Sequence, residues 1–193
     1  MISAGVDEVG RGPLAGPVIA AAVVLPHDFE LHGLTDSKLL STKKRSALND
    51  LIMQQALYWS LGRSDVEEID RVNIFNATLL AMKRAVESLA VRPDVSLIDG
   101  KWVPKLACRT RAIVKGDLTE PCISAASIVA KVARDREMCV LHADYPDYGF
   151  ERNKGYATAQ HLQALRCKGV CRAHRRSFAP VREVLSAQSQ LIF

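Results

Sequence analysis

The 193-residue sequence lacks several features that define a protein class at once. Its five cysteines are odd in number and irregularly spaced, which argues for reduced thiols rather than a disulfide scaffold. It has no internal repeat, low-complexity tract or Gly/Ser linker. Cys167, Cys171 and His174 form half of a zinc-site pattern, but no second ligand pair follows at finger-like spacing. At roughly 150 residues per domain, the length favours one domain, with room for a small appendage.

Long hydrophobic runs are also missing. The segment Val18–Leu25 is too short to span a bilayer. The acidic pair Asp7 and Glu8 precedes it, where a signal peptide would carry positive charge. With 48% hydrophobic and 24% charged residues, the chain falls in the globular range. We therefore expect a cytoplasmic protein without a membrane partner.

Basic residues are concentrated in the second half of the chain. Residues 1–100 contain 10 Lys and Arg against 13 Asp and Glu, whereas residues 101–193 contain 16 against 8. Between Arg152 and Arg182 there are eight basic residues and none that is acidic. Such a tract is typical of a nucleic-acid-binding surface, because each neutralised phosphate releases counterions. A solvated helical face would give the same charge pattern.

The hydrophobic pattern predicts strands that alternate with helices. The expected strands are 3–9, 18–25, 58–63, 95–98 and 112–114, and the expected helices are 42–57, 73–90 and 123–141. After Pro146 the pattern changes to loops and short helices. This order predicts an α/β fold with a mixed sheet, made of a core (1–143) and a helical C-terminal extension (144–193).

Three of the expected strands lead into an acidic residue. Asp7 and Glu8 end the first strand, while Asp99 and Asp117 follow two later apolar runs. Strands that lie side by side would bring these carboxylates to one edge of the sheet, where a divalent cation could neutralise them. Adjacent residues on a strand point to opposite faces, which makes Glu8 a weaker candidate than Asp7. Taken alone, each acid is better explained as a turn or helix-cap residue.

Further candidates for substrate contact lie in a glycine-rich turn, on the last long helix and in the basic tract. Gly10, Arg11 and Gly12 fit part of a dinucleotide-binding pattern, but a strand rather than a helix is expected to follow. The same glycines would allow backbone amides to approach a sugar or phosphate. The other candidates are Ser124, Ser127, Lys131 and Arg134 on one helix face, Tyr156, and the segment 174–178. Helix packing or a surface turn would explain these residues as well.

Seven segments, in order along the chain, form a combination that is specific to one family. They are GVDEVGRGPLAG (5–16), TDSK (35–38), IDG (98–100), VKGD (114–117), ISAASIVAK (123–131), NKGYAT (153–158) and HRRSF (174–178). Together they resemble the ribonuclease HII family, the bacterial type 2 ribonucleases H, over about residues 4–184. The Lys101 and Trp102 pair after Asp99-Gly100 departs from many relatives.

The resemblance implies an RNase H-like fold and an endonuclease that hydrolyses the RNA strand of RNA/DNA hybrids and nicks duplex DNA at embedded ribonucleotides. It assigns metal binding and catalysis to four carboxylates, namely Asp7, Glu8, Asp99 and Asp117. Two Mg²⁺ or Mn²⁺ ions about 4 Å apart would act there and leave 3′-hydroxyl and 5′-phosphate ends. The implied substrate contacts are Gly10, Arg11 and Gly12 for the 2′-hydroxyl, Tyr156 for the junction sugar, and Lys38, Ser127 and Lys131 for phosphates.

Three further expectations concern partners and alternatives. The last residues, Gln188–Phe193, loosely resemble a sliding-clamp-binding tail, which suggests a weak clamp contact. We expect the protein to be a monomer. A non-catalytic hybrid-binding module is the competing function, although unpaired carboxylates would repel the phosphates of such a partner.

Overall fold

The structure is a computed structural model that describes residues 1–27, 29 and 41–190, with only the backbone for Ser189 and Gln190. Five strands form one sheet in the order β3-β2-β1-β4-β5. The strands are β1 (Ser3–Val9), β2 (Val18–Val24), β3 (Tyr58–Ser64), β4 (Val95–Asp99) and β5 (Arg109–Ile113). β1 pairs antiparallel with β2 and parallel with β4, so the sheet is mixed, as the sequence predicts.

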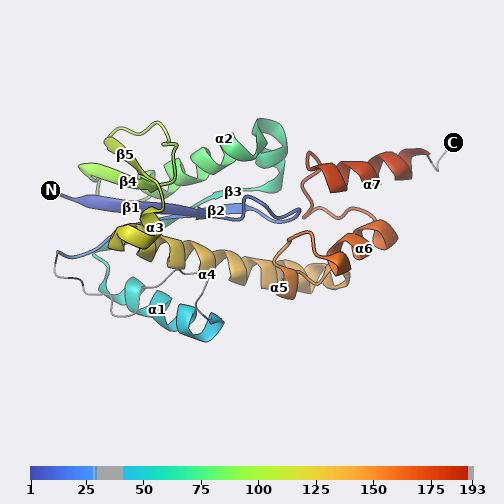
Figure 1. Cartoon of the computed structure of the whole chain (residues 1–193), viewed down its shortest axis with the longest axis horizontal. Helices are drawn as coiled ribbons and strands as arrows, with labels where there is room; N and C mark the ends of the chain where they lie inside the picture. Colours follow the sequence, from blue (N-terminus) through green and yellow to red (C-terminus); the bar gives the residue numbers. More distant parts are fainter. Residues whose placement is uncertain (28, 30–40, 191–193) are drawn as a thin grey trace.

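Helices cover both faces of the sheet (Figure 1). On one side α2 (Val66–Glu87) packs on alternate residues of β2, Val18, Ala20 and Ala22. On the other side α4 (Pro121–Asp144) packs on Ala21 and Val23, and α1 (Thr42–Gln55) lies against α4. Because every β2 residue is buried, this strand consists only of small and β-branched apolar residues.

The helix α2 begins earlier than the hydrophobic period indicates. The sequence predicts a helix from residue 73, but Asp65 caps the helix and Glu68 returns the hydrogen bond in a capping box. The backbone leaves the helical conformation at Asn73, where φ is 67°. Ile69 and Val72 precede this break and pack against the core, but the break separates this short segment from the longer apolar period that follows it.

The C-terminal region consists of short helices gathered at one end of the sheet (Figure 1). They are the 3₁₀ helix η1 (Pro146–Tyr148), α5 (Phe150–Asn153), α6 (Ala159–Lys168) and α7 (Ala179–Gln190). The short α3 (Gly116–Thr119) lies elsewhere, directly before α4. Asp70 of α2 accepts hydrogen bonds from the backbone amides of Arg176 and Ser177. Ala15, in the β1–β2 loop, forms a bridge with His174. The C-terminal region is therefore attached both to α2 and to the loop that follows β1.

Two further observations bear on the classes considered above. The Gly10–Ala15 segment leads into β2 rather than into a helix, so the structural context of a dinucleotide-binding turn is missing. Among the helices that the structure describes, none is both long enough and apolar enough to cross a membrane.

Candidate active site

The carboxylates of β1 and β4 meet because these strands are parallel neighbours. Val6 is paired with Ile98, so the next residues in register are Asp7 and Asp99. Both lie at the carboxyl ends of their strands, the edge at which open α/β sheets bind ligands. The structure thus brings together two acids that are separated by more than ninety positions in the sequence.

Asp117 reaches the same edge through the turn after β5. Lys115 adopts a left-handed conformation with φ of 58°, and α3 begins directly after it. The backbone amide of Asp117 donates a hydrogen bond of 3.3 Å to Oδ1 of Asp99. The expected position of Asp117 beside Asp99 is therefore confirmed, although a short helix rather than a strand carries it.

Glu8 also faces this edge, despite the alternation of side chains along β1. The Glu8 amide donates a 2.7 Å hydrogen bond to Oδ1 of Asp7, which folds the Asp7 carboxylate back along the strand end. Glu8 and Asp99 line one pocket together with Arg11, and Arg11 Nη1 lies 3.6 Å from Glu8 Oε1. Asp99 therefore has Asp7 and Glu8 as neighbours on the β1 side.

Burial and mutual repulsion make it costly to ionise all these carboxylates together. The pKa of Asp7 is raised well above its ordinary value by burial, then by the charges of Glu8 and Asp99, and a hydrogen bond from Ser127 opposes the rise in part. Burial raises the pKa of Glu8, which Arg11 partly offsets. Burial and the Asp117 charge raise the pKa of Asp99. A divalent cation would relieve these costs, and its preferred ligands are carboxylate oxygens.

The carboxylates line the edge without forming a closed coordination shell. Within residues 1–27, 29 and 41–190, no three His, Cys, Asp or Glu side chains converge tightly enough to hold a metal ion. The zinc pattern is likewise unsupported, because His174 hydrogen-bonds Cys171 while Cys167 is exposed. The carboxylate oxygens at the sheet edge are nevertheless the donor type that Mg²⁺ and Mn²⁺ prefer.

Of the expected substrate contacts, one group lies around the loop after β1 and another lies on α4. Gly12 and Tyr156 are close, since a Cβ on Gly12 would lie 3.5 Å from the Tyr156 ring, which is 46% exposed. Ser127 is buried on α4 and hydrogen-bonds Asp7. One turn later, Lys131 Nζ lies 2.6 Å from Oδ1 of Asp135. Lys38 lies outside the described residues.

Two arginines have a different environment from the one that the sequence suggests. Arg134 and Arg175 are completely buried, so the interpretation of these two side chains as phosphate contacts or as part of a surface turn is wrong. Their guanidinium groups bind backbone carbonyls of the β1–β2 loop. Burial and the nearby Arg134 charge lower the pKa of Arg175 to about 9, which leaves it protonated at neutral pH. The available sequence signal was the glycine-rich loop itself. Its backbone carbonyls are not paired within a β-sheet, so they need donors from elsewhere in the protein.

Comparison with known proteins identifies relatives along almost the whole chain. A family model described as Ribonuclease HII matches residues 4–181. Ribonuclease HII of Burkholderia thailandensis is 60% identical over 182 residues, which cover 94% of this chain and 85% of the relative. Ribonuclease HII of Coxiella burnetii is 55% identical over 184 residues, 95% of this chain and 91% of the relative.

Solved structures share the fold. Ribonuclease H2 from Pyrococcus horikoshii has a TM-score of 0.84 at 25% identity and covers 98% of this chain and 100% of that one. The RNase HII in a complex with PCNA from Archaeoglobus fulgidus has a TM-score of 0.78 at 25% identity, covering 93% and 96%. Bst-RNase HIII, solved in complex with Mn²⁺, has a TM-score of 0.75 at 20% identity, covering 98% and 71%, and shows likeness of fold alone.

Proposed function

Since the chain belongs to the ribonuclease HII family of endoribonucleases that act on RNA/DNA hybrids, we propose that it cleaves at ribonucleotides embedded in duplex DNA by metal-assisted hydrolysis. The observation that carries the proposal is the meeting of Asp7, Glu8, Asp99 and Asp117 at one sheet edge, supplied by strands and a helix distant in sequence. A non-catalytic binding module would gain nothing from this arrangement, because unneutralised carboxylates repel phosphates.

The four carboxylates are the proposed ligands of a two-ion site for Mg²⁺ or Mn²⁺. Bound there, the ions would activate water and stabilise the leaving 3′ oxygen, giving 3′-hydroxyl and 5′-phosphate products. The buried Asp7 carboxylate accepts hydrogen bonds from the Glu8 amide and from Ser127, so it would meet an ion in a fixed orientation. The Asp99 carboxylate accepts a hydrogen bond from the Asp117 amide, which couples the positions of these two residues. One copy of the chain supplies all four, which supports action as a monomer.

Substrate selection is assigned to the loop after β1. Gly10, Arg11 and Gly12 would contact the 2′-hydroxyl, the group that distinguishes RNA from DNA, while the adjacent Tyr156 ring would pack on the sugar at the junction. The phosphate contacts proposed for Lys38, Ser127 and Lys131 would position the duplex without reading its sequence. For Lys131 this requires exchange of its Asp135 partner. We place the activity in the cytoplasm.

The test is cleavage of an end-labelled duplex that carries a single ribonucleotide, with and without Mg²⁺. We expect Asp7→Asn, Asp99→Asn and Asp117→Asn each to reduce the rate by several orders of magnitude while the fold persists, as judged by circular dichroism. Each change removes a charge that the phosphate-bound ions need. Retained cleavage in all three variants, or cleavage in the absence of any divalent ion, would contradict the proposed chemistry.

A weak contact between Gln188–Phe193 and a sliding clamp is also proposed. Its support is the resemblance of this segment to clamp-binding tails, together with a solved neighbour whose RNase HII is in complex with PCNA. Most of the segment lies outside the described residues or has only its backbone described. Deleting Gln188–Phe193 should reduce clamp affinity in a binding assay and leave cleavage of free duplex unchanged, and equal affinity would remove this proposal.

A further inference from the structure

Arg175 donates every one of its described side-chain hydrogen bonds to a single loop. Its Nε donates to the Gly16 carbonyl at 3.0 Å, and its Nη2 donates to the same oxygen at 2.8 Å and to Gly10 at 2.6 Å. Its Nη1 donates to the Arg11 carbonyl at 2.9 Å. Gly10 and Gly16 stand at the two ends of the loop, so one planar guanidinium closes it.

Arg134 of α4 supports the same loop from its other end. Its Nε and Nη2 donate to the Pro17 and Ala15 carbonyls, at 3.0 and 3.1 Å. Its Nη1 donates to the Lys154 carbonyl at 3.0 Å, two residues before Tyr156. The loop and the Tyr156 turn are thereby held to one another through the protein interior.

The direction of the carbonyls determines the direction of the amides. In a trans peptide the carbonyl of one residue and the N–H of the next point in opposite directions. The described residues contain no cis peptide bond. The Gly10 and Arg11 carbonyls face Arg175, so the amides of Arg11 and Gly12 must face away from it.

These two amides are available to a ligand. Arg11 and Gly12 are exposed, and neither amide donates a hydrogen bond to any residue within the described part of the chain. The Tyr156 ring lies next to Gly12. An N–H donor beside an exposed aromatic ring suits a ribose, whose 2′-hydroxyl can accept a hydrogen bond.

We propose that Arg175 is a positioning residue for ribonucleotide selection, which holds the β1–β2 loop so that the Arg11 and Gly12 amides face the 2′-hydroxyl. This inference rests on the function proposed above. Lysine cannot replace the side chain, because a single ammonium nitrogen lacks the planar fork that reaches three carbonyls at once. Fixing the donors before the substrate arrives lowers the cost of binding.

The test separates selection from general folding by comparing two duplexes of the same sequence. The KM is measured for the duplex with one ribonucleotide, and the Ki is measured for the all-DNA duplex as competitor. For Arg175→Lys we expect KM to rise about tenfold, the equivalent of losing one or two hydrogen bonds, with Ki within about twofold of wild type. An unchanged KM, with only a lower apparent kcat from fewer folded molecules, would overturn the inference.

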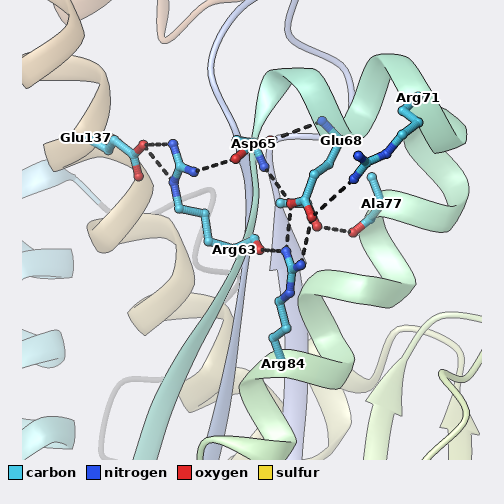
Figure 2. Close-up of polar contacts among 8 residues, drawn as sticks. Arg63, Asp65, Glu68, Arg71, Ala77, Arg84 and Glu137 are labelled. Atoms are coloured by element: carbon cyan, nitrogen blue, oxygen red, sulfur yellow. Dashed lines mark hydrogen bonds and ion pairs between the residues drawn. The ribbon is translucent and has the colours of Figure 1, made fainter.

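Arg84→Lys is the matched control. Arg84 also uses a planar fork, but its described side-chain bonds go to Glu68 and to the Arg63 carbonyl (Figure 2). We expect this variant to keep both KM and Ki. A tenfold rise in KM for both lysine variants would show that the effect does not depend on the contacts of Arg175 with the β1–β2 loop, and would contradict a specific role for Arg175.

A second measurement covers the case in which Arg175→Lys does not fold. In the Asp117→Asn protein, which keeps the duplex intact, amide NMR would follow the Arg11 and Gly12 signals. Both should shift with the ribonucleotide duplex and not with the all-DNA duplex, and equal shifts would overturn the inference. If wild type fails to cleave the ribonucleotide duplex, the proposed function fails; if it cleaves but Arg175→Lys keeps its KM, only this inference fails.

Discussion

Two groups of arginines in this protein make their polar contacts in opposite environments. Around Glu68, between β3, α2 and α4, Arg63, Arg71 and Arg84 pair with carboxylates on the surface (Figure 2). Behind the β1–β2 loop, Arg134 and Arg175 are buried, and their described hydrogen bonds go to neutral carbonyls. The first group is paired with carboxylates and reaches solvent, whereas the second is shielded from solvent and forms its described hydrogen bonds with backbone carbonyls alone.

The difference shows what each group is for. A surface pair contributes little to stability, about 0–1 kcal/mol, and salt screens it. A buried cation costs several kcal/mol to desolvate, so its carbonyl partners must be well placed to offset that cost. Shifting either buried guanidinium group away from its carbonyl partners is therefore costly. This property suits residues that hold a recognition loop in one conformation.

The largest effect is expected where a side chain would enter the buried group. A Cβ on Gly10 would lie 2.2 Å from Arg134 Nε, at a φ of 96°. Gly100 has nearly the same φ, 91°, but nothing within 4 Å of its Cβ position. Gly100→Ala should cost only the backbone strain, about 1–2 kcal/mol. Gly10→Ala should cost about 3 kcal/mol or more, because it also displaces a buried hydrogen-bonded charge.

Chemical denaturation of the two alanine variants measures this pair of effects. Gly100 controls for the positive φ, so the difference between the two variants measures the crowding that a Cβ on Gly10 meets from Arg134 and from the Pro17 carbonyl. Equal losses of unfolding free energy would show that the space around the buried arginine can relax, and would weaken the contrast between the two groups.

The pH dependence of stability tests the buried region through two histidines, His161 and His174, that lie next to the β1–β2 loop. His161 Nδ1 lies 2.8 Å from the Tyr156 carbonyl, and His161 Nε2 lies 3.0 Å from His174 Nε2. A carbonyl only accepts and the Cys171 amide only donates, so His161 carries its proton on Nδ1 and His174 carries its proton on Nε2. Both rings are held neutral.

Burial, followed by the neighbouring His161, lowers the pKa of His174 to about 4 from an ordinary 6.5. Its contribution to stability is complete above pH 6.5 and is lost as the pH falls toward 4, by about 3 kcal/mol in total. His174→Gln removes this titration, so the stability of wild type relative to the variant should decrease over that range. Parallel curves would show that His174 is protonated freely in the folded state.

Much of the sheet and its acidic edge could be predicted from the sequence, because apolar runs that end in an acid identify strands and their carboxyl ends together. Asp7 and Asp99 follow from that pattern once the strands are parallel neighbours. Glu8 was harder to place, since strand alternation directs it away from Asp7 and only the geometry at the strand end brings it to the same edge.

The buried arginines show where such reasoning stops. Arg175 lies in a basic tract and has the sequence context of a surface residue. Its burial depends on a loop that lies 159 to 165 positions earlier in the sequence and surrounds its side chain. Arg134 shares a helix face with Ser127 and Lys131, which gives no indication that α4 passes under Ala15 and Pro17 at this point. Both environments are set by tertiary contacts rather than by local pattern.

The smallest expected effect is on the surface group. The hydrogen bond from Arg84 lowers the pKa of Glu68, and both guanidinium Nη atoms lie 2.7 Å from its carboxylate oxygens. Glu68→Gln keeps an acceptor for the Asp65 amide and removes the charge, so it should cost less than about 1 kcal/mol at about 0.1 M salt. At about 1 M salt, where the Debye length falls to about 3 Å, the cost should shrink further. Urea titrations at the two salt concentrations measure it, and a cost that is large and independent of salt would show that this group behaves like the buried one.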